Sequence, residues 1–407
     1  MRVKLKTSRA AVGAAVRSGV TWGLTAACVA GAMSVACAAT QSKAPGAAAS
    51  CNVDWPGYRA FVGRFVQADG RVIDFSTASQ QTTSEGQSYA MFFALVANDR
   101  ATFDRLLAWT RTNLAANQFD PQNVRLPSWQ WGRKPDGSYG VLDPNSASDA
   151  DLWIAYDLLQ AGRLWHNSDY TKLGVALAQR IAHDEVVDLP GLGPMMLPGP
   201  QGFRTGDTTR MNASYMPLPL LRAMSKQLPD GPWSRLADST YRMIKTTSPL
   251  GFTPDWAAWR AGQFVVDPEH ADMGSYDAIR VYLWAGLASP TDPLARPWLA
   301  AIGGMRSRVS MQGFPPEKVA ATSGQGTGEG PLSYWGALAP YFKALGDERN
   351  LGLARTHLAA LDAPPVQGRE PVYYDRVLGL FGTGFIDGRY RFDDAGSLVP
   401  SWRNACD

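Results

Sequence analysis

Acidic residues at the starts of apolar helical segments are the part of this sequence that could do chemistry. Glu85 stands in the first turn of SEGQSYAMFFAL, a segment that is apolar on nearly every side. Asp149 and Asp151 open SDADLWIAYDLL, and Asp277 opens SYDAIRVYLW in the same way. For any one of them, capping of the helix is an ordinary explanation, worth about 1 kcal/mol. Their coincidence with Tyr, Trp and Arg at the same helix starts instead predicts a cleft lined by carboxylates and walled by aromatic rings.

Two carboxyl groups that face each other across a cleft are the catalytic groups typical of glycoside hydrolysis. One is protonated and donates its proton to the leaving oxygen, and the other stays ionised as a base or a nucleophile. Glu85 could be the donor only if something raises its pKa, because the N-terminus of a helix favours the ionised form. Burial and a nearby like charge both raise the pKa of an acid, and Asp149 is the candidate for that charge.

Tryptophan rings would supply the flat faces on which sugar rings stack. The candidates are Trp129 and Trp131 in LPSWQWG, Trp153 in DADLWIAYDLL, and Trp256 in GFTPDW. Most tryptophans are core residues in any protein, so we expect only about a third of those in this chain to face a ligand groove. The tryptophans in loops are the better candidates.

The elements that must position these residues are helices that arrive in pairs. Apolar periodicity and the residues that start and stop helices predict six pairs. They are 84–97 with 99–115, 149–165 with 168–186, 212–227 with 231–247, 275–288 with 293–311, 331–345 with 347–361, and 372–383 with the N-terminal 54–67. In most pairs the first member is strongly apolar and the second amphipathic, as expected of an inner layer covered by an outer one. We therefore predict an all-α fold, a ring of six inner helices wrapped by six outer helices.

Strand-like stretches are few in this sequence. GRVIDF and the hairpin pattern WAAWRAGQFVV are interpreted as minor β-hairpin decoration at one end of the ring. The polar starts of the inner helices would converge at one mouth of such a ring.

The N-terminal region has the pattern of an export signal. Residues 1–19 are basic and free of acids, an uncharged run follows, and Ala36, Cys37 and Ala38 fit an A-x-A cleavage site. We predict a signal peptide at 1–38, a flexible spacer rich in Ala, Gly and Ser at 39–50, and one catalytic domain at 51–407. An uncleaved membrane anchor and lipidation at Cys37 are the alternatives. The mature protein is expected in the periplasm or outside the cell, with no stable membrane span.

The mature chain is nearly neutral. Cleavage after Ala38 would remove five of the 39 Lys and Arg residues and leave 34 against 36 acids. A nucleic-acid partner would call for a clustered basic face, so none is expected. No metal-ligand spacing occurs, and we expect neither a metal nor a cofactor.

Two cysteines are expected to form a disulfide. Cys28 and Cys37 lie in the signal region, which leaves Cys51 and Cys406 at the two ends of the mature domain. In an oxidising compartment they should pair. If the last helix packs on the first, the bridge between Cys51 and Cys406 closes the ring. Two unrelated free thiols are the alternative.

Two other classes of protein fit parts of the pattern. A polysaccharide lyase would favour His, Tyr and Arg, but the four histidines lie outside the motif segments and no basic cluster appears. A glucan-binding subunit of an export complex would need the aromatic groove but no acid pair. The presence of Glu85, Asp149 and Asp277 together favours the enzyme.

Five stretches of the chain carry a family resemblance: TTSEGQSYAMFFALVANDRATFD, LDPNSASDADLWIAYDLLQAGRLW, PGLGPMMLPG, SYDAIRVYLW and GFPPEKV. They resemble glycoside hydrolase family 8, in particular the periplasmic endoglucanases that accompany bacterial cellulose synthase. The match runs in order from about Cys51 to Cys406. It implies an (α/α)6 barrel and an inverting endo-β-1,4-glucanase, in agreement with the helix pairs.

The resemblance also implies roles for single residues. Glu85 matches the general acid, Asp277 the base that activates water, and Asp149 a third carboxylate that holds the sugar at the scissile bond. Arg280 lies one turn after Asp277 on the same helical face and would keep the base ionised and oriented. An outer ion pair is its alternative role. Tyr215 in NASY would contact the sugar or the water.

The implied substrate is a β-1,4-glucan chain, and the implied partner is the cellulose synthase complex. Related barrels cut cellulose, mixed-linkage glucan, xylan or chitosan. Cationic chitosan would favour a markedly acidic groove, of which the mature net charge gives no sign, so cellulose-type glucan is preferred. We expect a monomer.

Overall fold

The computed structural model describes residues 54–361 and 371–403, all of them within the compact unit formed by residues 50–407. The predicted signal peptide (1–38), the spacer (39–50) and both Cys51 and Cys406 lie outside the described residues. No helix in the described part of the chain is long and apolar enough to cross a membrane.

Six inner helices form a closed ring. They are α2 (Ser84–Val96), α4 (Ser148–Leu164), α6 (Leu218–Gln227), α8 (Ala278–Leu287), α11 (Leu332–Ala344) and α13 (Tyr373–Ile386). Each packs on the next in this order, and α13 closes on α2 where the ring of Phe381 lies 5.3 Å from Phe92 and 4.8 Å from Phe93. Every residue of α8 is buried, as is every residue of α2 except Glu85. Helices so apolar on all sides can only stand inside a second layer.

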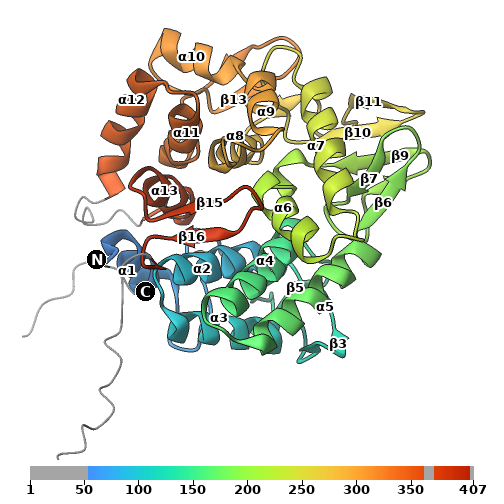
Figure 1. Ribbon diagram of the computed structural model, residues 1–407, viewed down its shortest axis with the longest axis vertical. Helices are drawn as coiled ribbons and strands as arrows, with labels where there is room; N and C mark the ends of the chain where they lie inside the picture. The colour runs from blue at the N-terminus through green and yellow to red at the C-terminus, as the bar shows by residue number, and fades with distance from the viewer. Residues whose placement is uncertain (1–53, 362–370, 404–407) are drawn as a thin grey trace, which may run out of the picture. The chain divides into compact units, whose positions relative to one another are not determined.

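The outer layer supplies that cover (Figure 1). Its helices are α1 (Pro56–Phe65), α3 (Arg100–Asn113), α5 (Ser168–Asp184), α7 (Trp233–Thr247), α9 (Ala295–Ala301), α10 (Gly304–Gln312) and α12 (Glu348–Leu358). Each inner helix packs on the outer helix predicted for it, including α13 on the N-terminal α1. In α3 one face, with Phe103, Leu106 and Leu107, is buried while the opposite face is solvated. The predicted all-α (α/α)6 barrel is confirmed.

The largest differences from the predicted helix bounds concern two helices. The third inner helix was expected from residue 212, but a short 3-10 turn, η1 (Ala213–Tyr215), comes first and α6 begins only at Leu218. Pro217 is the reason, because a proline disfavours helical backbone at the residue before it, here Met216. The fourth outer helix is broken into α9 and α10 at Gly303, where the Gly304 N–H donates to the Gly251 carbonyl at 3.1 Å.

The strands form six small antiparallel sheets in the described part of the chain, more than the predicted decoration. The larger sheets contain β1 (Thr82–Thr83), β4 (Gln130–Arg133) and β5 (Tyr139–Asp143); β8 (Arg204–Thr205), β9 (Thr208–Met211), β10 (Ala257–Arg260) and β11 (Gln263–Val266); and β12 (Met273–Gly274), β13 (Lys318–Ala320) and β14 (Gly326–Thr327). The pairs are β2 (Phe119–Asp120) with β3 (Asn123–Val124), β6 (Val186–Leu189) with β7 (Gly193–Met196), and β15 (Tyr390–Phe392) with β16 (Leu398–Pro400).

The predicted hairpin in residues 256–266 is confirmed as β10 and β11. Its two turn residues, Ala261 and Gly262, both have positive φ, 49° and 79°, as a tight hairpin turn requires. The stretch GRVIDF was expected to be strand-like, but it forms only an isolated bridge between Val66 and Val72. Except for β15 and β16, all strands precede an inner helix, so they gather at the end of the ring where the inner helices begin.

Candidate active site

Arg280 brings two of the three predicted acids together. It lies in the first turn of α8 and is only 8% exposed. Its Nη2 atom lies 3.2 Å from Asp277 Oδ1 and 3.6 Å from Asp149 Oδ2, and it donates to Ser214 Oγ at 2.9 Å. An outer ion pair is therefore excluded. A buried guanidinium shared by two carboxylates of different helices fixes both with respect to each other.

Glu85 is the acid that keeps its proton. It stands in the first turn of α2, where the Thr83 side chain caps the helix by accepting from the Gly86 N–H at 3.0 Å. Burial, then the charge of Asp149, raise the pKa of Glu85 to about 8, against backbone hydrogen bonding and Arg280, which lower it. The structure thus agrees with the expectation that burial and Asp149 outweigh the helix dipole at this position.

Asp149 is almost inaccessible, with 1% of its surface exposed. Its Oδ1 atom accepts from the Ala150 N–H at 2.9 Å in the first turn of α4, while no hydrogen-bond donor reaches Oδ2 in the described part of the chain. Burial raises the pKa of Asp149 to about 6; Arg280 opposes this shift and Asp277 adds to it. The pKa of Asp149 therefore lies below that of Glu85, so Asp149 gives up its proton first as the pH rises.

Asp277 sits immediately before α8 with its side chain 31% exposed. Its Oδ2 atom accepts from Asn212 Nδ2 at 2.9 Å, so Asn212 and Arg280 together orient the two carboxylate oxygens. Asp277 makes no capping bond to its own helix. Asp255 takes that role, accepting from the N–H groups of Ser275 and Ala278, each at 2.7 Å. Asp277 is thereby left free to act on a ligand.

Sequence reasoning singled out neither Asn212 nor Asp255. Asn212 belongs to NASY, one of the polar helix starts, and Asp255 directly precedes Trp256. These were the only signals that could have pointed to them. Tyr215, which was predicted, is half-buried, and the Arg280 guanidinium lies 5.9 Å from the centre of its ring.

A cavity of about 190 Å³ lies at this end of the barrel. Glu85 and Arg280 line it together with the aromatic side chains of Tyr89, Tyr373 and Tyr374. The hydroxyls of Tyr89 and Tyr373 are buried and have no hydrogen-bond partner among the described residues. A cavity that combines a protonated acid, a cation and phenol hydroxyls suits a ligand rich in hydroxyl groups.

The predicted tryptophans divide into three positions. Trp129 and Trp131 are half-buried, and the pairing of β4 with β1 places them beside the start of α2 that carries Glu85. Trp131 stacks on Tyr139, with ring centres 5.5 Å apart. Trp153 was predicted to bind substrate, and this is wrong: it is 0% exposed and packs in the barrel core against Phe92. An indole without accessible surface cannot stack on a glucan chain.

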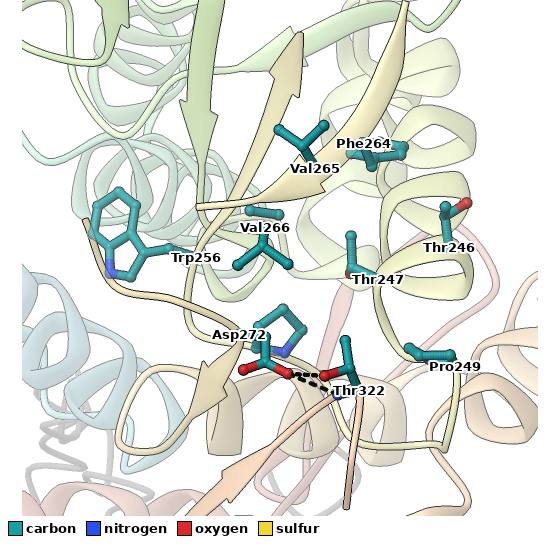
Figure 2. A pocket seen from close by; sticks show the side chains of 11 residues that line it. Thr246, Thr247, Pro249, Trp256, Phe264, Val265, Val266, Asp272 and Thr322 are labelled. Atoms are coloured by element: carbon teal, nitrogen blue, oxygen red, sulfur yellow. Dashed lines mark hydrogen bonds between the residues drawn. The ribbon is translucent and has the colours of Figure 1, made fainter. Parts of the chain in front are cut away.

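Trp256 borders a separate cavity of about 120 Å³ (Figure 2). Figure 2 shows Thr247 and Val266 across from it, and Asp272 accepting from the backbone N–H of Thr322 at 2.9 Å. None of the three predicted acids lines this cavity. Half-buried, Trp256 stacks on His270, with ring centres 5.1 Å apart.

Comparison with known proteins gives a family for this arrangement. The model of Glycosyl hydrolases family 8 matches residues 29–388. An endoglucanase of Xanthomonas axonopodis pv. citri is 44% identical over 353 residues, which cover 86% of this chain and 91% of that protein.

Solved structures give the same result. The endo-1,4-D-glucanase of Vibrio fischeri ES114 is 40% identical and superposes with a TM-score of 0.79 over 86% of this chain and all of that one. The endo-β-1,4-glucanase of Acetobacter xylinum is 26% identical, with a TM-score of 0.64 over 80% of this chain and 95% of that one. The chain that places Glu85, Asp149 and Asp277 around Arg280 belongs to glycosyl hydrolase family 8.

Proposed function

We propose that this protein is an endo-β-1,4-glucanase that cleaves cellulose-type chains with inversion at the anomeric carbon. The observation that carries the proposal is the unequal protonation of acids in one site. Arg280 holds Asp149 and Asp277 at 3.6 and 3.2 Å, while the pKa of Glu85 is raised to about 8 by burial and Asp149. Environments that separate the pKa values of neighbouring acids assign an acid and a base.

The reaction follows from these assignments. Glu85 donates its proton to the glycosidic oxygen as the bond from that oxygen to the anomeric carbon breaks. A water molecule attacks the same carbon from the opposite face and gives one proton to Asp277. Asp149 stays ionised and holds the sugar at the scissile bond. Glu85 ends ionised and Asp277 protonated, so the two acids must exchange a proton with solvent before the next cycle.

The stereochemical outcome tests this mechanism. Room for a water molecule requires the carboxyls of Glu85 and Asp277 to be roughly 6.5–9.5 Å apart in the complex, against about 5–5.5 Å for a retaining pair. Proton NMR early in the hydrolysis of a β-1,4-glucan should therefore show the α anomer first. Initial β product, or a trapped glycosyl-enzyme, would make one of these acids a nucleophile and reject the inverting assignment.

The substrate class is tested by the products from carboxymethylcellulose, lichenan, xylan and chitosan. We expect reducing ends to appear fastest from a β-1,4-linked glucan, because the relatives named above are endoglucanases. Faster cleavage of xylan or chitosan would keep the fold and mechanism but change the substrate. Binding without any new reducing ends would support a non-catalytic glucan-binding subunit.

The cellular role belongs to the same proposal. We infer that the exported, monomeric enzyme trims glucan chains as they leave a cellulose synthase complex. This rests on the resemblance of its motifs and on the predicted signal peptide 1–38. In the native host, deletion of the gene should change the yield or crystallinity of cellulose, and Glu85→Gln should fail to restore it. An unchanged polymer would argue for a role separate from synthesis.

A further inference from the structure

A second pair of carboxyls lies buried behind Asp149. Asp151 follows Asp149 by two residues in the first turn of α4, and Glu185 is the C-cap residue directly after α5. Both are 0% exposed, and no ion pair of the described residues joins either of them to a cation. We call these two residues the acid pair. The proposed mechanism uses neither of them.

The two carboxyls of the acid pair are neighbours, and each acts on the pKa of the other. They lie within hydrogen-bonding reach, and Ser146 Oγ donates to Glu185 Oε1 at 2.6 Å. The Ser146 hydroxyl also lies near Asp151, but its one proton goes to Glu185. Neither oxygen of Asp151, nor Oε2 of Glu185, has a hydrogen-bond donor among the described residues. Because two ionised carboxylates repel each other and offer no donor, a bond between them requires a proton on one. Burial and mutual repulsion raise the pKa of Asp151, in agreement with Asp151 as the proton holder.

The acid pair is connected to the segment that carries Asp149. Glu185 accepts from Ser146, and its carbonyl accepts from the Leu197 N–H at 2.8 Å. The Leu197 carbonyl in turn accepts from Ser148 Oγ at 2.6 Å, directly before Asp149. Asp149 itself is held at Oδ1 by the Ala150 N–H of the same helix turn, while its Oδ2 atom has only Arg280, at 3.6 Å. Its position therefore depends on how firmly the start of α4 is held.

We propose that the acid pair is a positioning device, in which one proton shared by Asp151 and Glu185 locks the start of α4 to the end of α5 and keeps Asp149 at Arg280. This inference rests on the proposed function of Asp149. Two other charged groups face the pair: Asp149 itself and Asp184, which is engaged on the surface by Arg180 and His183. Loss of the shared proton would place a further negative charge beside Asp149.

A conservative and an apolar variant of Asp151 distinguish a role in positioning Asp149 from a role in packing alone. Asp151→Asn keeps a donor toward Glu185 and should retain most of the activity. Asp151→Leu leaves the Glu185 carboxylate buried without a donor and should lower kcat by about 10- to 100-fold with a smaller change in KM, because misplaced positioning groups cost rate. Equal loss in both variants, or an unchanged kcat in a folded Asp151→Leu protein, would overturn the proposal.

The pH dependence of thermal unfolding tests whether Asp151 and Glu185 share a proton, and it needs no assay of activity. A raised pKa in the folded state means that stability is lost as pH rises through that pKa. Asp151→Asn holds its donor at every pH, so its Tm relative to wild type should rise between pH 5 and pH 9. Asp188→Asn, an exposed acid nearby, is the control and should not show this trend. A constant difference for Asp151→Asn would exclude the shared proton.

Failure of the proposed function is distinguishable from failure of this inference. A wild-type protein that cleaves none of the polysaccharides would reject the function, while the unfolding series would still decide whether the acid pair shares a proton.

Discussion

At the scale of the residue, the chemistry of the site depends on which of its acids carry a proton. Arg280 contacts both Asp149 and Asp277 and opposes the rise in the pKa of Asp149, whereas burial and the charge of Asp149 raise the pKa of Glu85. The pKa of Glu85 is about 8 and that of Asp149 about 6, so at neutral pH the first is protonated and the second is not. Environment, not residue type, separates the pKa values of these two acids.

The pH dependence of kcat/KM should reflect the ionisation of Glu85. A general acid works only while protonated, so kcat/KM should fall as pH rises through about 8, the pKa to which burial and Asp149 raise this carboxyl. Glu85→Gln should lower kcat by about 10²- to 10⁴-fold and leave oligosaccharide binding measurable by calorimetry. Glu348→Gln is a matched control, because Glu348 also stands in the first turn of a helix but is exposed. A Glu85→Gln enzyme with near-normal turnover would remove the acid assignment.

The sequence alone predicted the three acids of the candidate site, but not the residues that hydrogen-bond to Asp277 or cap its helix. The raised pKa of Glu85 followed from what a general acid requires. Asn212 and Asp255 were missed because their bonds span 65 and 23 residues, to Asp277 and Ala278, and exist only once the barrel has closed. Trp153 was misassigned because composition does not tell whether an indole faces a groove or a core.

At the scale of the element, the inner helices approach one another closely through glycines. A side-chain carbon at Gly382 in α13 would lie 2.1 Å from the carbonyl oxygen of Gly336 in α11. A carbon at Gly286 in α8 would lie 2.3 Å from the Tyr341 nitrogen in α11. These contacts are to backbone, which cannot turn away as a flexible side chain could. The diameter of the ring is thus set by residues that have no side chain.

Gly382→Ala should therefore destabilise the barrel by about 1–3 kcal/mol or more, because the added methyl group overpacks a rigid helix contact. Gly352→Ala in the outer helix α12 is the control, since nothing lies within 4 Å of a carbon added there. It should be neutral or stabilise by about 0.5–1 kcal/mol through helix propensity. Urea unfolding of both variants measures the difference. Similar midpoints would mean that α11 and α13 can move apart at little cost.

The presence of each helix could be predicted from the sequence. The helix boundaries could be predicted only where a local sequence signal, such as a proline, sets them. The strongly apolar composition of inner helices such as α2 and α8 follows from their burial on nearly every side, so it is visible in sequence. The late start of α6 follows from Pro217, a local signal that was overlooked. The break at Gly303 depends on the loop at Gly251, which occupies the adjoining space, and no local pattern announces it.

At the scale of the whole molecule, both described ends of the domain lie where the inner helices finish. The Asp54 carbonyl accepts from Arg389 Nη1 at 3.0 Å, just after α13. The indole N–H of Trp402 donates to the Leu95 carbonyl at 3.0 Å, near the end of α2. Closure of the ring by α1 and α13 thus joins the two ends at the face opposite to Glu85. A covalent link there would stabilise the barrel without touching the site.

The disulfide predicted between Cys51 and Cys406 would be such a link, three residues before Asp54 and four after Trp402. Because it would restrict the unfolded chain, its removal should cost about 2–5 kcal/mol of stability and leave kcat at 25 °C unchanged. Mass spectrometry of non-reduced peptides should find the linked pair in exported protein. Cys51→Ser, Cys406→Ser and the double variant should be destabilised equally, since each removes the same bond. Two free thiols, or additive losses in the double variant, would show that the ring is held by packing alone.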